Sequence, residues 1–204
     1  MQRRRALLAC GAALALPAHA KAQGQPARVA ADDTLTRALQ QAQASGGVLM
    51  LRHALAPGTF DPPGFRLGDC STQRNLNDEG RQQARQLGAW LAARQLRPVR
   101  VRSSPWCRCL DTARLAFGEP VEPWAALGSP RAGSDAVNAQ ALVQLRQGLA
   151  SVAARRAGLE AWVTHMFVFS ALLGEGAGSG EGVLLGVGAD GEPRVLARLA
   201  GLTG

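Results

Sequence analysis

Several features that mark other classes of protein are absent from this chain of 204 residues. It has no tyrosine, and no run rich in Lys or Arg follows its first residues, so no nucleic-acid surface is indicated. The sequence contains no H-C-x5-R loop, no G-x4-G-K-[ST] nucleotide loop, no H-E-x2-H zinc motif and no G-x-S-x-G nucleophile elbow. These absences exclude the commonest sequence forms of cysteine-, nucleotide-, zinc- and serine-dependent sites.

Charged residues are also scarce, at 19% of the chain, whereas hydrophobic residues make up 47%. These proportions exclude extended disorder and fit one ordinary domain. The formal net charge is +8, and the first 20 residues supply three of the basic side chains and no acid, so +5 remains without them. A basic balance suits an anionic ligand, although it also serves solubility.

The first 20 residues predict a secretory signal peptide. Arg3–Arg5 form a basic start, 6–16 an apolar stretch too short to span a bilayer, and 18–20 (AHA) a cleavage site. A lipid anchor at Cys10 is the second interpretation, and a retained anchor or a buried helix is the third. We therefore expect an exported, periplasmic protein with no membrane span once the signal is removed.

Three cysteines follow the predicted signal: Cys70, Cys107 and Cys109. In an oxidising compartment an odd number indicates one disulfide and one free thiol. A bond from Cys70 to Cys107 or to Cys109 would tie a loop to the segment that carries Arg108, and three unpaired buried thiols are the alternative. The C-x-C spacing is unusual for zinc, so no metal site is predicted.

Helical and strand patterns alternate along the chain after a lead over 21–31 that we expect to be flexible. Helices are expected from Asp32 or Asp33 to about Ala44, and over 77–96, 106–117 and 135–157. Strands are expected over 48–51, 98–102, 121–125 and 160–164, and a hairpin over 182–199. Residues 54–76, rich in proline and glycine, predict a long functional loop. The alternation predicts a single α/β domain over 32–204, a layered sandwich on a mostly parallel sheet.

Only two histidines remain after the predicted signal, and each directly follows a predicted strand. His53 comes after Arg52 at the end of one strand, and His165 ends another. Because the carboxyl ends of the strands form the ligand-binding edge of such sheets, both imidazoles are expected to face one crevice. Arg108, which begins a helix after a third strand, would join Arg52 there.

This combination of side chains favours phosphate chemistry. Two guanidinium groups suit a phosphate dianion, and an imidazole is a competent nucleophile toward phosphorus. A single histidine at a strand end is more often structural than catalytic. The pairing of two from distant segments, with Arg52 beside the first, is therefore the informative feature.

Four motifs in order resemble the signatures of the histidine phosphatase superfamily, also called phosphoglycerate-mutase-like. They are Leu51-Arg52-His53-Ala54, Arg74-Asn75-Leu76-x3-Gly80-x2-Gln83-Ala84, Ser103-Ser104-Pro105-x2-Arg108-x3-Thr112-Ala113 and Val163-Thr164-His165. The match runs from about Val48 to the strand near Val187. The resemblance implies a three-layer α/β/α fold and a covalent phosphohistidine intermediate, with neither a metal nor another cofactor.

The resemblance also implies a role for each matched residue. His53 would be the nucleophile, Arg52 and Arg108 would clamp the phosphoryl oxygens, and His165 would complete the pocket. Arg74 would face the substrate, or would instead be a loop arginine paired with an acidic neighbour.

Two positions depart from the family pattern. Ala54 stands where a glycine is usual, which is harmless if its backbone has a negative φ. The carboxylic acid that protonates the leaving oxygen is not placed by any motif. Our candidates, in order, are Glu181, Asp61 and Asp135, although a surface position is the commoner fate of a carboxylate.

The sequence thus predicts a periplasmic phosphomonoesterase that acts on a small phosphorylated substrate. An envelope sugar phosphate is the candidate substrate. Two alternatives stay open: a phosphoprotein phosphatase, and a non-catalytic module that binds phosphate or another anion. Oligomeric state is not determined by the sequence.

Overall fold

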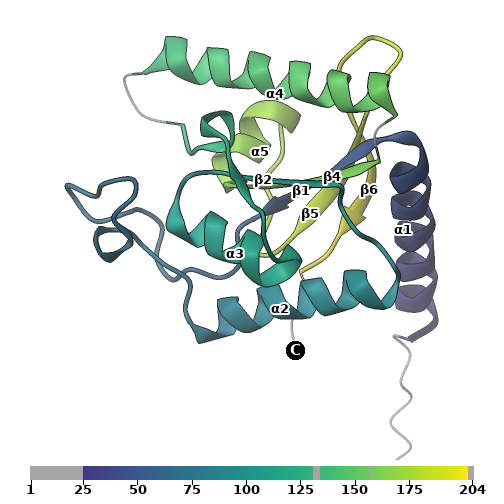
Figure 1. Cartoon of the computed structure of the whole chain (residues 1–204), viewed down its shortest axis with the longest axis horizontal. Helices are drawn as coiled ribbons and strands as arrows, with labels where there is room; N and C mark the ends of the chain where they lie inside the picture. The colour runs from purple at the N-terminus through teal and green to yellow at the C-terminus, as the bar shows by residue number, and fades with distance from the viewer. Residues whose placement is uncertain (1–24, 131–133, 157, 202–204) are drawn as a thin grey trace, which may run out of the picture.

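A six-stranded sheet with helices on both faces organises the residues that the computed structural model describes, 25–130, 134–156 and 158–201 (Figure 1). The strands are β1 (Gly47–Arg52), β2 (Arg100–Ser103), β3 (Glu122–Pro123), β4 (Leu159–Thr164), β5 (Gly182–Val187) and β6 (Pro193–Leu199), in the spatial order β3-β2-β4-β1-β5-β6. The β3-β2, β2-β4 and β4-β1 pairs are parallel, and the β1-β5 and β5-β6 pairs are antiparallel. The predicted α/β sandwich on a mostly parallel sheet is confirmed.

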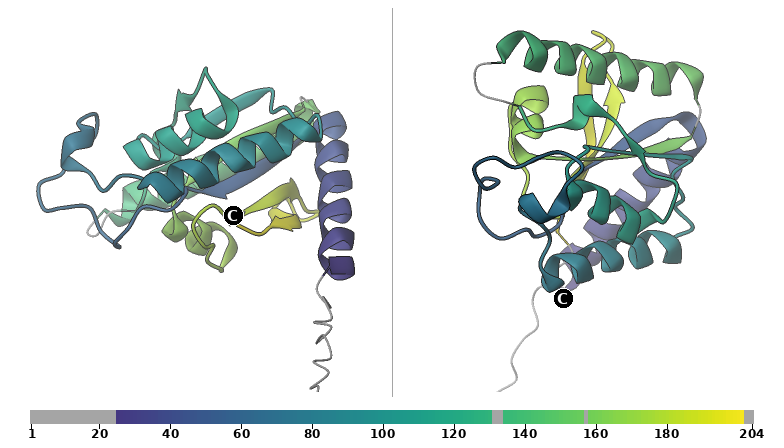
Figure 2. Two further views of the ribbon diagram at one scale, coloured as in Figure 1. Left: turned by 90° about the horizontal axis from the view of Figure 1, so that it is seen from below. Right: turned by 60° about the vertical axis from the view of Figure 1, so that its left-hand side comes forward.

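Five helices form the outer layers. They are α1 (Gln25–Ser45), α2 (Asp78–Ala93), α3 (Cys107–Phe117), α4 (Asp135–Arg155) and α5 (Met166–Leu173), with short 3-10 turns η1 (Cys70–Thr72) and η2 (Ala125–Leu127). Side chains of α1, α2 and α3 share one buried cluster, whereas those of α4 and α5 belong to the other. Figure 2 shows α2 and α4 on opposite sides of the sheet, so the fold has three layers.

Strand β1 lies at the centre of both clusters. Leu49 and Leu51 pack against the α1–α3 side, while Val48 and Met50 pack against the α4–α5 side. All four side chains are fully buried. The unbroken apolar run in the sequence therefore does indicate a strand covered on both faces.

The first helix begins earlier than predicted. It includes residues 25–31, which we expected to be a flexible lead, and it begins at Gln25 rather than near Asp32. Pro26 lies in the first turn, where a missing N–H removes no intrahelical hydrogen bond, and so it does not stop the helix. The predicted signal and Cys10 lie outside the described residues.

Helix α5 was not predicted. Its sequence, MFVFSALL, is apolar at nearly every position, so it shows no amphipathic period from which a helix could be distinguished. The helix begins directly after His165 and ends at Gly174, whose φ of 75° is readily adopted by glycine. Among the described helices, none has the length and apolar character needed to cross a bilayer.

The long loop between β1 and α2 is irregular as predicted, apart from η1. A disulfide joins Cys70 in this loop to Cys107 at the start of α3, and Cys109 remains a buried free thiol. The pairing that the sequence left open is therefore Cys70 with Cys107. At the end of the loop Asn77 caps α2, because its side chain accepts a hydrogen bond from Gly80 N at 2.8 Å.

Candidate active site

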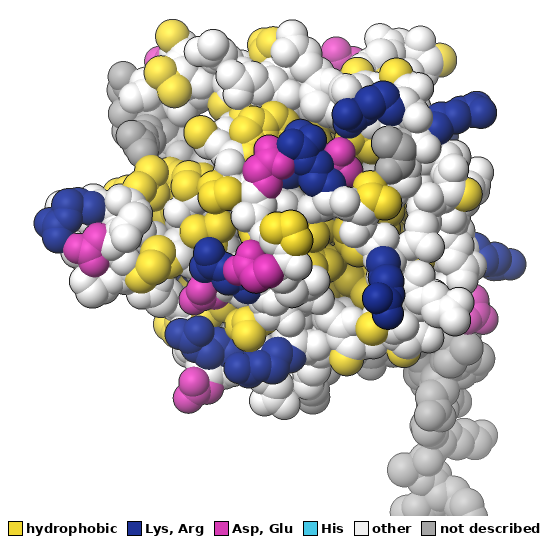
Figure 3. Space-filling model, viewed as in Figure 1, with side chains coloured by type: hydrophobic (Ala, Val, Ile, Leu, Met, Phe, Trp, Pro, Cys, Tyr) yellow, Lys and Arg dark blue, Asp and Glu magenta, His cyan; other side chains and the backbone are white. Residues whose placement is uncertain are grey.

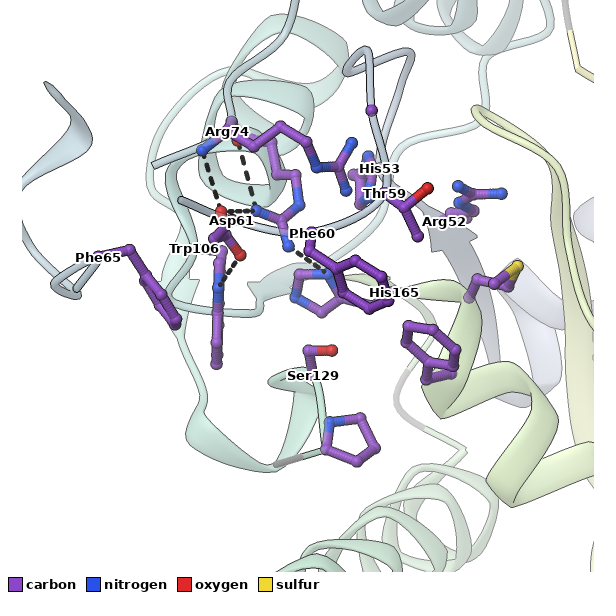
Figure 4. Close-up of a pocket in the computed structure, with 15 residues that line it drawn as sticks. Arg52, His53, Thr59, Phe60, Asp61, Phe65, Arg74, Trp106, Ser129 and His165 are labelled. Atoms are coloured by element: carbon purple, nitrogen blue, oxygen red, sulfur yellow. Dashed lines mark hydrogen bonds and ion pairs between the residues drawn. The ribbon is translucent and has the colours of Figure 1, made fainter. Parts of the chain in front are cut away.

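The pairing of β1 with β4 brings the two histidines together. Arg52 lies opposite Thr164 in this parallel pair, so the next residue of each strand is a histidine. His53 N donates a hydrogen bond to the Thr164 carbonyl at 2.9 Å, and the centroids of the His53 and His165 rings are 5.5 Å apart. The two imidazoles therefore do meet across one site, as Figure 4 shows.

A pocket of about 560 Å³ opens over these rings. Five of the six residues proposed for the site line it: Arg52, His53, Arg74, Arg108 and His165. Glu181, the sixth, does not.

The His53 ring is held with one nitrogen free to react. Its Nδ1 lies 2.8 Å from the Ala54 carbonyl, which can only accept, so Nδ1 carries the proton and Nε2 keeps a lone pair. Burial lowers the pKa of His53 to about 3, and the neighbouring Arg108 adds to the shift. At neutral pH the ring is therefore uncharged and nucleophilic at Nε2.

His165 is also held as a neutral ring. Arg108 Nη2 can only donate, so His165 Nδ1 accepts from it at 3.3 Å, and His165 Nε2 donates to Ser104 Oγ at 2.7 Å. Burial lowers the pKa of His165 well below its usual value, and Arg108 and His53 add to the shift. The ring thus presents a polar edge beside His53 without adding a charge.

Positive charge in the pocket comes from three arginines. Nη1 of Arg52 donates to the Ala177 carbonyl at 2.8 Å, and Nη1 of Arg74 donates to the Ala56 carbonyl. Arg74 therefore bonds to the backbone, and not to the acidic neighbours considered as an alternative. Burial is the main reason that the pKa values of Arg52 and Arg74 lie below that of a free arginine.

Each of these arginines keeps a buried donor without an acceptor. The Nε atoms of Arg52, Arg74 and Arg108 are buried and make no hydrogen bond to any described residue. Three guanidinium groups around one pocket give it a positive charge that suits an anionic ligand.

Asp61, from the long loop, lines the same pocket. Its carboxylate accepts from Arg108 Nη1 at 2.8 Å, from Arg74 N at 3.0 Å and from Trp106 Nε1 at 3.1 Å. Burial by itself would raise the pKa of Asp61, but the hydrogen bonds and the charge of Arg108 outweigh it and lower the pKa. The carboxylate is therefore ionised and neutralises part of the positive charge.

The other two predicted acids lie outside the pocket lining. Glu181 turns onto the glycine-rich segment before β5, where its Oε2 accepts from Gly178 N at 2.7 Å. Its backbone carbonyl meanwhile accepts from Arg52 N at 2.9 Å, which fixes its position in the sheet. Asp135 lies in the first turn of α4. The structure thus brings Asp61 into the pocket and leaves Glu181 and Asp135 out.

Two polar side chains on the helices hold the turn that follows His53. Thr112 Oγ1 accepts from Ala54 N at 3.0 Å, and Gln83 Oε1 accepts from Leu55 N at 3.1 Å. Gln83 also donates to the Ser179 carbonyl at 2.9 Å, which connects the turn to the glycine-rich segment. Both residues lie within the quoted motifs, but the motifs alone gave neither of them a role.

Ala54 fits its position without strain. Among the described residues the non-glycine positions with positive φ are Gln95 and Arg156, so Ala54 is not in the left-handed region. Its side chain is buried against Leu76 and Ala84. The departure from glycine therefore does not distort the turn.

Further side chains surround His165 that the sequence analysis did not single out. The Trp106 ring meets it edge-on at 5.1 Å between centroids, and Cys109 Sγ lies 3.5 Å from His165 Nε2. Burial raises the pKa of Cys109 to about 12, so it stays a thiol and is not a nucleophile. These residues pack the ring in place.

Comparisons with known proteins agree with this site. A family model, the histidine phosphatase superfamily (branch 1), matches residues 48–134. A search of curated proteins finds no match.

Among solved structures, three examples show a similar fold. The open reading frame Rv3214 from Mycobacterium tuberculosis is 20% identical, with 78% of this chain and 98% of that chain covered and a TM-score of 0.56. The protein histidine phosphatase SixA complexed with tungstate is 16% identical, with 76% and 96% covered and a TM-score of 0.54. A phosphoserine phosphatase mutant from Entamoeba histolytica is 14% identical, with 77% and 98% covered and a TM-score of 0.54.

The fold is therefore of the phosphoglycerate-mutase-like, histidine-phosphatase type. The predicted resemblance to the histidine phosphatase superfamily is confirmed: the family model matches the chain from β1 to the loop before α4, a stretch that holds three of the four motifs.

Proposed function

We propose that this protein is a phosphomonoesterase that works through a covalent phosphohistidine on His53 and needs no metal ion. One observation carries the proposal. The unprotonated Nε2 of His53 belongs to a pocket that Arg52, Arg74 and Arg108 also line. A nucleophile beside a phosphate cradle of three guanidinium groups is the arrangement that phosphoryl transfer requires.

In the first step, the phosphoryl oxygens accept hydrogen bonds from Arg52, Arg74 and Arg108. Nε2 of His53 then attacks phosphorus, the N–P bond forms, and the bond to the ester oxygen breaks with its electron pair on that oxygen. The Nδ1–H bond to the Ala54 carbonyl keeps the ring aligned and stabilises the positive charge that it gains.

In the second step, water attacks phosphorus and the N–P bond breaks with its electron pair on Nε2. Inorganic phosphate leaves as dihydrogen phosphate, with both protons of that water, and His53 returns to its neutral form. The leaving alcohol of the first step takes up one proton, and Asp61 is the predicted acid that lies in the pocket. Its ion pair with Arg108 keeps it ionised before substrate binds, whereas an arriving dianion competes for Arg108 and raises the pKa of Asp61.

We further propose that the protein is exported to the periplasm, with lipid anchoring through Cys10 as the alternative. The signal-like residues 1–20 and the Cys70–Cys107 disulfide support export, because disulfides persist in oxidising compartments. A small phosphorylated molecule of that compartment is then the substrate, and a sugar phosphate of the envelope is a first candidate.

The test is turnover of p-nitrophenyl phosphate by protein beginning at Lys21, between pH 4 and pH 8 with EDTA present. His53→Ala should abolish turnover, and exposed Val143→Ala on α4 should not change it. Rapid quenching with labelled substrate should trap acid-labile phosphate on the parent and none on His53→Ala. Full activity of His53→Ala would contradict the proposal.

A second candidate function is a phosphate-binding module without turnover. It is favoured by the ionised state of Asp61, because the acid that lines the pocket is tied to Arg108 and Trp106. Binding of inorganic phosphate that depends on Arg52 and Arg108, with no turnover of any phosphomonoester, would support this candidate over the enzyme.

A further inference from the structure

The lining of the pocket changes character above the arginines. Beyond the phosphate cradle, aromatic and other apolar side chains dominate: Phe60, Phe65, Trp106, Pro130, Met166 and Phe167. They come from four parts of the fold: the long loop, the β2–α3 connection, the η2–α4 connection and α5. The mouth is therefore an apolar ring around a charged floor.

Two of these aromatic rings are exposed at the pocket mouth, where a bound ligand can cover them. Phe60 is 77% exposed and Phe167 is 41% exposed, although both line the pocket. Figure 3 shows hydrophobic side chains gathered on the left of the view, between the tip of the long loop and the body of the molecule. Large apolar side chains clustered at the mouth of a cavity mark a surface that a ligand covers.

Among the described residues, polar partners for a hydroxyl-rich ligand are few at this mouth. Outside the cradle, Thr59 and Ser129 supply the side-chain hydroxyls of the lining, and the carboxylate of Asp61 is already engaged by three donors. A sugar would leave several hydroxyl groups desolvated against phenyl rings without hydrogen bonds, and each such loss costs affinity.

We infer that the pocket selects phosphomonoesters whose organic group is apolar over those whose organic group carries many hydroxyls. The inference rests on the proposed function for the position of the phosphate, and it replaces the sugar phosphate as the favoured substrate class. The phosphoryl group lies on Arg52, Arg74 and Arg108, and the organic group lies between Phe60 on the loop and Phe167 on α5.

Binding of stable analogues tests the selection without relying on turnover. Benzylphosphonate and methylphosphonate carry the same charged group and differ in the phenyl ring. By calorimetry, benzylphosphonate should bind at least about tenfold more tightly, the gain expected from burying one aromatic ring. Equal affinities would overturn the inference.

Turnover gives a second measurement with matched chemistry. Benzyl phosphate and glucose 6-phosphate are both esters of primary alcohols, so the bond that breaks is similar and the organic group is what differs. We expect kcat/KM to be at least about tenfold higher for benzyl phosphate. A ratio of one or less would contradict the inference.

Variants of the exposed rings locate the effect. In Phe60→Ala and Phe167→Ala, KM for benzyl phosphate should rise about three- to tenfold, while inhibition by inorganic phosphate stays unchanged. Leu196→Ala on β6 is the control, because Leu196 is 51% exposed and does not line the pocket. If the ring variants weakened inorganic phosphate and benzyl phosphate equally, the rings would not be contacting the organic group.

These measurements distinguish failure of the proposed enzymatic function from failure of the apolar preference. Absence of turnover with every ester would remove the proposed function, while the phosphonate affinities would still decide the selection. Turnover that depends on His53 but ignores the organic group would retain the enzyme and reject the apolar preference.

Discussion

Asp61 and Arg108 form a buried ion pair in the wall of the pocket, with 2.8 Å between Asp61 Oδ1 and Arg108 Nη1. The side chains are 9% and 4% exposed, so water screens this pair little. Because Arg108 also donates to His165, the carboxylate sets the position of a guanidinium that lies beside both histidines. The loop between β1 and α2 thereby controls the charge of the site.

Asp61→Asn separates a role in proton donation from a role in positioning. If Asp61 protonates the leaving oxygen, kcat for benzyl phosphate should fall by about 100-fold or more, whereas kcat for p-nitrophenyl phosphate should fall only a few-fold, because nitrophenolate leaves without a proton. Inorganic phosphate should inhibit more strongly, since a negative charge near the cradle is lost. Asp190→Asn in the β5–β6 hairpin is the control. An equal loss with both substrates would show that Asp61 only positions Arg108.

The buried histidines predict that the free protein loses stability in mild acid. His53 has a folded pKa of about 3, below its usual 6.5, so between these values the unfolded chain binds more protons than the folded one. The free energy of unfolding should therefore be highest above about pH 6.5 and fall on acidification, by up to about 1.4 kcal/mol per pH unit for each such histidine.

Urea titrations between pH 7 and pH 4.5 measure this slope. His165, whose pKa is also lowered, adds to it. His53→Gln should reduce the slope of the unfolding free energy against pH by the contribution of one histidine. A stability that does not change with pH in this range would contradict the buried, neutral state of both rings.

The Cys70–Cys107 disulfide predicts that the long loop depends on oxidation. The bond closes a loop of 37 residues that includes Arg74, and it ties the segment that follows Asp61 to α3, so its loss should cost about 4 kcal/mol through the entropy of the unfolded chain. Double substitution of both cysteines by serine, followed by thermal unfolding, measures the cost. In the folded variant KM should rise, because Asp61 and Phe60 lose an anchor, whereas Cys109→Ser leaves the disulfide intact. An unchanged KM would show that the loop is held by its other contacts.

Much of this site was predictable because it follows from periodic patterns and from the ends of strands. The apolar run at 48–51 indicates a strand, and parallel pairing with the strand that ends at Thr164 then places His53 beside His165. The arginines follow from the same argument, since Arg52 ends β1 and Arg108 lies in the first turn of the helix that follows β2.

The rest depends on side-chain contacts that no periodicity encodes. Glu181 directly precedes β5, where an acid was expected, yet the backbone N–H of Gly178 binds its carboxylate outside the pocket. Asp61 reaches the pocket because the loop that carries it folds back onto α3. Helix α5 has no polar face, so its sequence shows no helical period. The roles of Thr112 and Gln83 follow only from the structure, in which they accept hydrogen bonds from the backbone N–H groups of the turn after His53.

Gly80→Ala should be strongly destabilising, although glycine to alanine is usually favourable in a helix. A Cβ at Gly80 would lie 2.0 Å from the Leu55 carbonyl oxygen, a backbone atom that cannot rotate away. Helix α2 would have to move away from the turn that Gln83 holds, two residues from His53. We expect a loss of about 2 kcal/mol or more, as for overpacking of a core, together with a lower kcat. Urea unfolding and turnover measure both effects, and Gln82→Ala on the exposed side of α2 is the control. A stable, fully active Gly80→Ala would mean that α2 and the turn after His53 are not packed this closely.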